Sequence, residues 1–335
     1  MTLANPLWLA PLAGVTTAPV REFFSRLGAG LTHTEMVSCA GLLAGNRKTQ
    51  DMLKFPPEDE YFSGFFRSPE VPVVLQLFAG DANKMAYGAQ AALEAAGSCS
   101  FAALGINMAC PMPKVMKHGA GAALMSTPKT AFDMTRAVKR LGLPVWVKTR
   151  KTPEMPETLR LIERLVEAGA DNVCLHGRTP AQRYEGRADR QIVAAAAARF
   201  PGKISASGDV CTVEDIKEYL GVGCVGVMLA RGALADPYLF PRALSALSYP
   251  VPPELTEPTL EQRLDRLKHL GERSRQFHGP RLAAALLKRL TAGALKGMRG
   301  SGELRRRAGS ATDLDELLQN LGAGLQTLEL GGIER

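Results

Sequence analysis

The 335 residues, 46% of them hydrophobic and 22% charged, have the composition of a globular protein with one large domain and a smaller one. No apolar run reaches the roughly 18 residues that cross a bilayer, and residues 1–6 lack the basic start and apolar core of a signal peptide, so we expect a cytoplasmic protein with no membrane partner. The net charge of +8 is compatible with a polyanionic partner.

Short apolar runs alternate with longer helical patterns up to about residue 240. Segments such as 84–96, 157–168 and 189–199 have the apolar spacing of helices. Alternating units of this kind predict a parallel sheet with crossover helices. Eight units in about 240 residues fit an α/β fold of the TIM (β/α)8 barrel type, typically about 250 residues, better than an open sheet. The expected strands are 7–13, 31–36, 73–77, 103–107, 145–148, 173–176, 203–207 and 225–229.

The expected strands end in polar or small residues. A buried strand that ends in a lysine, a histidine or an amide must give that group a partner. In a barrel the carboxyl ends of all strands converge on one face, so we expect these residues to form one site. In chain order the ends are Pro11-Leu12-Ala13-Gly14, Glu35, Gln76, Asn107, Lys148, His176, Ser207-Gly208-Asp209 and Ala230-Arg231-Gly232.

The chain changes character after about residue 250. Pro250-Val251-Pro252-Pro253 marks a break, and helical patterns follow it. Residues 258–310 contain thirteen Lys or Arg against four Asp or Glu, including the run Arg305-Arg306-Arg307. Most charge runs are solvated helix faces, but an excess of one sign in one segment favours contact with a phosphate backbone. We therefore expect a small C-terminal helical domain that binds nucleic acid.

The cysteines give no sign of a metal site. The six of them, at 39, 99, 110, 174, 211 and 224, form no C-x-x-C pair, and no histidine lies at zinc-ligand spacing. We expect neither a bound metal nor a disulfide framework. Cys174 and Cys224, each beside a valine in an apolar run, are expected to be buried thiols.

The last two strand ends favour a phosphate site. Ser207-Gly208-Asp209 and Ala230-Arg231-Gly232 place small residues and backbone N–H groups in the loops after the seventh and eighth strands, where such barrels bind phosphate. Arg231 is able to add a bidentate contact. Each loop alone is equally compatible with glycine turns, and their paired position favours a phosphate.

Lys148 and Gln76 are expected to face the barrel centre, where they suit the pyrimidine edge of a flavin. A fixed cation stabilises the anionic reduced ring, and an amide bonds the carbonyl and N–H groups of that edge. Two alternatives stay open: an ion pair of Lys148 with Glu35 or Asp209, and a core amide at Gln76 that bonds the backbone.

Cys110 lies where the strand segment Ile106-Asn107-Met108-Ala109-Cys110-Pro111 gives way to a turn. It is compatible with a nucleophile, a general acid or a core thiol. No adjacent His-Asp pattern indicates a thiol protease. A free thiol has a pKa of about 8.5, so at neutral pH it is mostly protonated and suits an acid opposite a hydride donor.

Taken together, these segments resemble the tRNA-dihydrouridine synthases, flavin enzymes that reduce the C5–C6 bond of uridine. The resemblance spans roughly residues 8–240, and the helical tail is similar only in its pattern. Its most specific parts are Asn107-Met108-Ala109-Cys110-Pro111 and His176-Gly177-Arg178-Thr179, in this order on one barrel. The other matching segments are 10–16 with Arg21, 76–80, Lys114-Val115, 147–150, Tyr184-Glu185-Gly186 and 226–233.

The resemblance implies that FMN lies over the barrel mouth. Pro11, Leu12 and Ala13 would support its ring, and Gln76 and Lys148 would hold its polar edge. The ribityl chain and phosphate would be held by His176, Ser207, Gly208, Asp209, Ala230 and Arg231.

The resemblance also implies the reaction and the partner. NADPH, or NADH, would reduce the flavin, hydride would pass from N5 to C6 of a uracil flipped out of tRNA, and Cys110 would protonate C5. Asn107 and Arg178 would contact the target nucleotide. Residues 1–245 would form the FMN-binding catalytic barrel, and residues 255–335 a basic helical domain that holds the RNA.

The chain departs from the family pattern at three positions. Ala109 replaces the glycine usual before the cysteine, Ser207 replaces the asparagine usual before Gly-Asp, and Ala230 replaces the glycine usual before arginine. The last two lie in the expected phosphate loops, where an added methyl or a shorter hydrogen-bonding arm changes the approach to phosphate. We therefore expect FMN affinity or pose to differ, whereas the retained Cys110, Lys148 and His176 predict catalysis.

Two other functions are compatible with parts of the sequence. A small-molecule FMN oxidoreductase of the dihydroorotate dehydrogenase or old yellow enzyme kind has the same barrel, but the basic tail and the HGRT motif argue against it. A non-catalytic RNA-binding protein is the other alternative, and the altered phosphate loops are the feature that suggests it.

Overall fold

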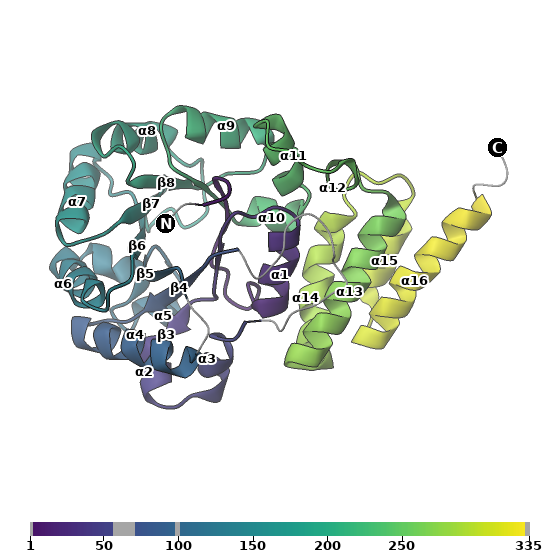
Figure 1. Ribbon diagram of the computed structural model, residues 1–335, viewed down its shortest axis with the longest axis horizontal. Coiled ribbons are helices and arrows are strands. Elements are labelled where there is room, and N and C mark those ends of the chain that lie inside the picture. Colours follow the sequence, from purple (N-terminus) through teal and green to yellow (C-terminus); the bar gives the residue numbers. More distant parts are fainter. Residues whose placement is uncertain (1–2, 56–70, 98–100, 332–335) are drawn as a thin grey trace.

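The computed structural model describes residues 3–55, 71–97 and 101–331, in which a parallel sheet curls into a barrel and a group of helices follows it (Figure 1). A strand overlaps each of the eight expected segments, and the short β3, which pairs with β4, was not expected. The strands are β1 (Leu7–Leu9), β2 (Thr32–His33), β3 (Val37–Ser38), β4 (Val73–Phe78), β5 (Ala103–Met108), β6 (Val145–Arg150), β7 (Asn172–His176), β8 (Ile204–Ser207) and β9 (Val227–Leu229).

The barrel closes between its first two strands. All pairings are parallel, in the order β1-β9-β8-β7-β6-β5-β4-β2. An isolated bridge between Trp8 and Leu31, with the Leu9 N–H donating to the Leu31 carbonyl at 2.9 Å, joins the two ends of this series. The expected TIM barrel is therefore confirmed, and its eighth barrel strand is β9.

Helices alternate with the strands and cover the outside of the barrel. The three helices expected at 84–96, 157–168 and 189–199 are α4 (Ala82–Ala96), α7 (Met155–Glu167) and α8 (Arg190–Arg199). Capping residues fix several starts: Asp81 accepts the Lys84 N–H before α4, and Asp189 does the same for the first turn of α8. The others are α1 (Ala18–Arg26), α2 (Cys39–Leu43), α3 (Arg47–Asp51), α5 (Pro113–Met116), the 3-10 turn η3 (Gly121–Met125), α6 (Pro128–Lys139), α9 (Val213–Gly221), α10 (Arg231–Ala235) and α11 (Leu239–Ala246).

The first strand is shorter than its apolar run suggested. The expectation was residues 7–13, but β1 ends at Leu9 because the chain turns back on itself at Leu12. The Leu12 carbonyl accepts the N–H groups of Val15 and Thr16, each at 3.0 Å. The turn lifts residues 11–13 out of the sheet and places them across the barrel mouth.

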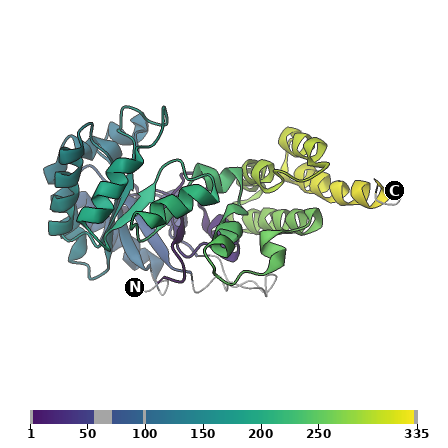
Figure 2. The same cartoon turned by 90° about the horizontal axis from the view of Figure 1, so that it is seen from above.

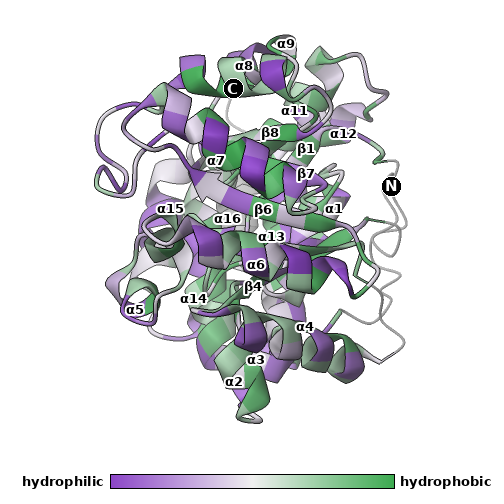
Figure 3. Cartoon of the chain, turned by 90° about the vertical axis from the view of Figure 1, so that its left-hand side faces the viewer, coloured by the Kyte–Doolittle hydropathy of each residue, from purple (hydrophilic) through white to green (hydrophobic). Residues whose placement is uncertain are grey.

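The core has an inner and an outer part. Inside the barrel, Trp8, Leu31, Val74 and Ala103 pack with Trp146, whose ring centroid lies 4.8 Å from that of Trp8. The larger cluster lies between the sheet and its helices, and outer helices such as α6 and α7 carry both hydrophobic and hydrophilic bands (Figure 3). Strand residues therefore alternate between the two parts, and the polar strand ends share the inward face.

Helices after residue 250 extend from one side of the barrel (Figure 2). A capping box formed by Thr259 and Gln262 starts the first long one, and Gly279, with φ 79°, ends it before Pro280 begins the next. Leucines of these helices, such as Leu267 and Leu287, are buried in the main core cluster. The helices are α12 (Pro253–Thr256), α13 (Leu260–His278), α14 (Pro280–Ala294), α15 (Ser301–Ser310) and α16 (Leu314–Gly331).

The helical region docks on α1 and α10. Helix α13 packs against α1, where the buried Glu22 accepts hydrogen bonds from both Arg26 and Arg273. Helix α14 approaches α10 so closely that a Cβ at Gly293 would lie 1.9 Å from the Leu234 carbonyl oxygen. Helix α10 begins at Arg231, at the barrel mouth, so this contact fixes the helical region beside the mouth.

Candidate active site

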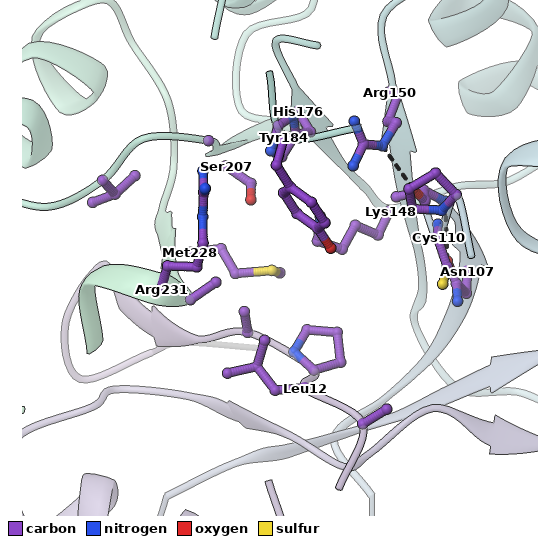
Figure 4. Close-up of a pocket in the computed structure, with 18 of the residues that line it drawn as sticks. Leu12, Asn107, Cys110, Lys148, Arg150, His176, Tyr184, Ser207, Met228 and Arg231 are labelled. Carbon is purple, nitrogen blue, oxygen red and sulfur yellow. Dashed lines mark hydrogen bonds between the residues drawn. The ribbon is translucent and has the colours of Figure 1, made fainter. Parts of the chain in front are cut away.

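A cavity of about 330 Å³ opens at the carboxyl ends of the strands (Figure 4). Its lining includes every residue that the sequence predicted for a site except Gly14, Glu35, Gln76 and Arg178. Leu12 lies on one side of the cavity, with Lys148 and Tyr184 across from it, and Cys110 and Arg231 lie on opposite sides (Figure 4). The volume is that of a site for a small organic molecule.

One wall of the cavity is apolar and held firmly. It consists of Pro11, Leu12 and Ala13 in the loop after β1. The Leu12 N–H donates to Thr16 Oγ1 at 3.1 Å. The Gly14 N–H, two residues further along, donates to Glu35 Oε1 at 2.5 Å. Burial raises the pKa of the Glu35 carboxyl above its ordinary value. The wall is thus a fixed surface against which a flat ring can pack.

Lys148 extends into the cavity from β6. Among the described residues it makes neither the ion pair with Glu35 nor the one with Asp209 that the sequence left open, since Glu35 binds Gly14 and Asp209 binds two arginines. Burial lowers the pKa of the Lys148 ammonium. A desolvated cation without a carboxylate partner here is suited to an anionic or electron-rich ligand.

Gln76 lies beneath the cavity, in the barrel interior. Its side chain is 2% exposed, and its Nε2 has no hydrogen-bond partner among the described residues. A Cβ on the neighbouring Gly105 would lie 3.1 Å from Gln76 Oε1, a tight contact, so the glycine gives the amide room. A buried, unpartnered amide N–H costs free energy unless a ligand accepts from it.

His176 presents a neutral imidazole to the cavity. Its Nδ1 accepts the Arg178 N–H at 3.2 Å, which assigns the ring proton to Nε2. Burial, followed by the nearby Lys148 and Arg150 cations, lowers the pKa of His176 to about 2. At neutral pH the ring is therefore a hydrogen-bond donor without charge.

The two loops predicted to bind phosphate lie side by side. A Cβ at Gly232 would lie 2.0 Å from the Val210 carbonyl oxygen, so only glycine allows this approach. Gly208 has φ 113°, and a Cβ there would lie 2.9 Å from that of Ala188. The Ser207 side chain faces the cavity (Figure 4), and Arg231 starts α10 at its rim.

Asp209 and Arg178 hold the loops together. The Arg178 guanidinium donates to both carboxylate oxygens of Asp209, at 2.8 and 2.6 Å, and to the carbonyls of Glu185 and Gly186. Arg231 donates to the same carboxylate at 3.0 Å. These bonds stabilise Asp209 in the left-handed region, with φ 50°.

Arg178 is buried behind the cavity lining. Its side chain is only 2% exposed and is absent from the cavity lining. Each of its three guanidinium nitrogens already donates to the protein. We interpret it as a residue that positions the loops, and direct contact with a nucleotide stays a prediction.

Cys110 is half-buried on the wall formed by the loop after β5. Asn107 Oδ1 accepts the N–H groups of Ala109 and Cys110, at 3.0 and 3.1 Å, and Asn107 Nδ2 contacts Met36 Sδ at 2.9 Å. Asn107 is thus both part of the cavity lining and the support of the cysteine loop. The loop presents the thiol toward the cavity, and the thiol forms no hydrogen bond with a histidine or carboxylate among the described residues.

Several lining residues were not predicted from the sequence. Met228 and Arg150 lie on the inward face two positions from the predicted Ala230 and Lys148, so the period of two along a strand was the available signal. Tyr184 and Cys211 lie in loops, where no such period exists. The others include Met36, Met112 and Val210.

The other cysteines of the described residues are free thiols and form no metal site. Cys174 and Cys224 are buried, as expected, and both are free thiols; Cys99 lies outside the described residues. No group of three or more His, Cys, Asp or Glu in the ranges that the structure covers is arranged to hold a metal ion. In those same ranges, no helix has the length and apolarity needed to cross a membrane.

The comparison with protein-family models agrees with this geometry. The model described as dihydrouridine synthase (Dus) matches residues 8–329. The chain belongs to the dihydrouridine synthase family. As a family member it is an enzyme, and the match includes the C-terminal helices, beyond the residues whose motifs carried the resemblance.

Individual relatives of this family member align over most of its length. It is similar to a probable tRNA-dihydrouridine synthase of Aquifex aeolicus, 28% identical over 318 residues, which are 93% of this chain and 94% of the relative. A probable tRNA-dihydrouridine synthase of Treponema pallidum is 31% identical over 278 residues, 79% of this chain and 76% of the relative. A tRNA-dihydrouridine synthase B of Vibrio cholerae is 31% identical over 289 residues, 84% of each chain.

Proposed function

We propose that this enzyme reduces the C5–C6 double bond of uridine in tRNA to 5,6-dihydrouridine, with FMN as its bound cofactor and NADPH as the reductant. The observation that carries the proposal is the cavity itself, in which the Cys110 thiol and the Lys148 ammonium share a wall opposite an apolar surface. The names of the relatives support tRNA as the substrate. The enzyme would act in the cytoplasm.

The cavity walls fit the ring of FMN. Pro11, Leu12 and Ala13 would pack against one face of the ring. Lys148 and the unpartnered Nε2 of Gln76 would hold the pyrimidine edge, the first as a cation and the second as an N–H donor. When bound, FMN supplies the hydride for the reduction, and NADPH restores it.

The opposite end of the cavity fits the ribityl phosphate. His176 would donate a hydrogen bond from Nε2. Ser207 would offer its hydroxyl, and Gly208, which has no side chain, would let the backbone come close to the ligand. The N–H groups at the start of α10 and the Arg231 guanidinium would meet the phosphate, with Asp209 holding that arginine in place.

Two departures from the family pattern lie at this end. Ser207 is 3% exposed, and its hydroxyl forms no hydrogen bond with any of the described residues, so it is available to a ligand. Ala230 adds a methyl group to the rim of the cavity. We expect FMN binding to persist with a changed affinity, because Gly208 and Gly232 keep the two loops in close contact.

The residues around Cys110 would complete the reaction at the base. A uracil flipped out of the RNA would stack on the flavin side of the cavity. The Cys110 thiol would give its proton to C5, and Asn107 would hold the loop that carries the thiol. Lys148, close to the same wall, would keep that side of the cavity positive.

The helical region would hold the RNA. We propose that residues 1–245 act as the FMN-binding catalytic barrel and residues 255–335 as the basic RNA-binding domain. Arg289 of α14 donates to the Gly14 carbonyl at 3.2 Å, next to the apolar wall, so the basic helices reach the rim of the cavity. RNA bound along them would bring its flipped base to the mouth.

The visible absorption spectrum of the purified protein tests the cofactor, and an assay on uridine-containing tRNA tests the reaction. We expect a yellow protein that releases FMN and forms dihydrouridine when NADPH is present. A protein that is colourless and cannot be reconstituted with FMN contradicts the proposal. A yellow protein that oxidises NADPH with a free pyrimidine or an enone, and not with tRNA, contradicts the substrate alone.

A further inference from the structure

Arg150 joins two loops that lie far apart in the sequence. It ends β6, its side chain is buried, and it lines the cavity. Its Nε donates to the Ala109 carbonyl at 2.7 Å, and its Nη1 donates to the carbonyls of Thr179 and Arg183 at 3.1 and 2.8 Å. One guanidinium therefore binds the cysteine loop on one side and the loop after β7 on the other.

The bond to Ala109 acts on Cys110 directly. The Ala109 carbonyl and the Cys110 N–H belong to the same peptide unit, which is planar and rigid. Arg150 binds the oxygen of this unit, and Asn107 Oδ1 accepts its N–H at 3.1 Å. The peptide that carries the thiol is thus held at both of its polar ends.

The bond to Arg183 acts on Tyr184 in the same way. Arg183 has φ 47°, a backbone conformation that needs outside support in a residue other than glycine. Tyr184 follows it, and its ring lies between two guanidinium groups, 5.7 Å from Arg150 and 5.1 Å from Arg231. Its hydroxyl points into the cavity (Figure 4).

We propose that Arg150 is a positioning residue that locks the Cys110 loop to the 179–184 loop, so that the thiol and the Tyr184 hydroxyl keep fixed relative positions on the cavity wall. A planar guanidinium is needed for this, because its N–H groups diverge toward the two loops, whereas an ammonium is a point donor. The consequence for catalysis rests on the proposed function; the coupling of the two loops does not.

Amide hydrogen exchange of the protein as purified tests the coupling. In Arg150→Gln we expect the amides of Ala109 and Cys110 and those of residues 179 and 181–185 to exchange at least about tenfold faster, because a charge-assisted bond is lost at each loop. Asn107→Ala is expected to release the cysteine loop alone. Arg160→Gln, which removes the same charge from the exposed face of α7, is the control and is expected to change neither.

Faster exchange in only one loop, or no difference from Arg160→Gln, overturns the proposal. If amides throughout the barrel exchange faster in Arg150→Gln, the whole fold is destabilised, and Arg150→Lys becomes the test variant. We expect Arg150→Lys to keep at most one of the two loops protected from exchange. Full protection of both loops in Arg150→Lys also overturns the coupling.

Kinetics separate this role from a merely structural one. We expect Arg150→Gln to lower kcat for dihydrouridine formation roughly 10- to 100-fold, since misplacing a reacting group by about 1 Å costs this much. KM for tRNA is expected to change little, because the helical region would hold the RNA. An unchanged kcat, with both loops released, overturns the catalytic consequence; absence of dihydrouridine with the unaltered enzyme refutes the proposed function and leaves the exchange result intact.

Discussion

Asn107 uses its amide oxygen twice, for the N–H groups of Ala109 and Cys110. This bonding explains why a strand that ends in asparagine can present a thiol beside its last residue: the side chain replaces the strand partners that the turning backbone has lost. The thiol that results is half-buried and lines the cavity. Its position suits a proton donor to a ligand bound there.

Replacing that thiol tests its role. We expect Cys110→Ala to keep the flavin absorbance and NADPH oxidation but to lose roughly 10²- to 10⁴-fold in dihydrouridine formation, the range typical of a general acid. Product formation on tRNA and the flavin spectrum are measured on the same preparation. Undiminished product would remove Cys110 from the acid role, and loss of the flavin would make it a cofactor contact instead.

Single residues were predictable from the sequence to the extent that they end a strand. Lys148, His176 and Ser207 follow the period of two and line the cavity. Arg178 is also a polar residue close to a strand end, but its side chain is buried against Asp209 and does not line the cavity. A sequence does not reveal this, because the carboxylate that binds the arginine lies 31 residues further along.

At the scale of elements, the basic helices contain fewer free cations than their composition suggested. Arg306 and Arg307 both donate to Glu303 within α15, and Arg275 of α13 binds Asp315 of α16. Helical spacing of three and four residues makes such pairs common. The exposed residues Arg281, Lys296, Arg299 and Arg305 have no charged partner among the described residues, which makes them the stronger candidates for RNA contact.

Charge reversal of Arg305, Arg306 and Arg307 together tests the helical surface. If α15 contacts RNA, we expect tRNA affinity to fall and the dependence of log affinity on log salt to lose up to about three units of slope, one for each phosphate contact. Flavin absorbance is expected to stay unchanged. Binding is measured over a series of salt concentrations.

A matched control is available on the outer wall of the barrel. Lys129, Arg136 and Arg140 also provide three cations on and beside one helix, two of them paired with Asp133. Their reversal is expected to leave the salt slope nearly unchanged. Equal losses in the two triple variants would mean a general charge effect and would assign the α15 run to a solvated face.

At the scale of the whole molecule, the relation between barrel and helices depends on buried contacts. Glu22 of α1 is 5% exposed and accepts from Arg26 of its own helix and from Arg273 of α13. The two bonds to Arg273 measure 3.2 and 3.3 Å. Removing one member of a buried ionic group is costly because the remaining charges stay desolvated.

Glu22→Gln is therefore expected to lower the free energy of unfolding by about 3 kcal/mol, and to loosen the docking of α13. Chemical denaturation measures the first effect. The control is Glu163→Gln, which breaks an exposed pair with Arg199 and is expected to cost less than about 1 kcal/mol. Equal costs for the two variants would contradict the importance of this contact.

The sequence by itself determined the barrel, the face on which the site lies and most of the residues that line it. These features arise from alternating apolar runs, helix caps and polar strand ends. Such patterns involve residues close together in the sequence, so they can be recognised without the fold. The tertiary structure alone decided the partners: Asp209 for Arg178, Glu22 for Arg273, and the Ala109 carbonyl for Arg150. Each of these joins segments distant in sequence, where only the folded chain establishes which donor meets which acceptor.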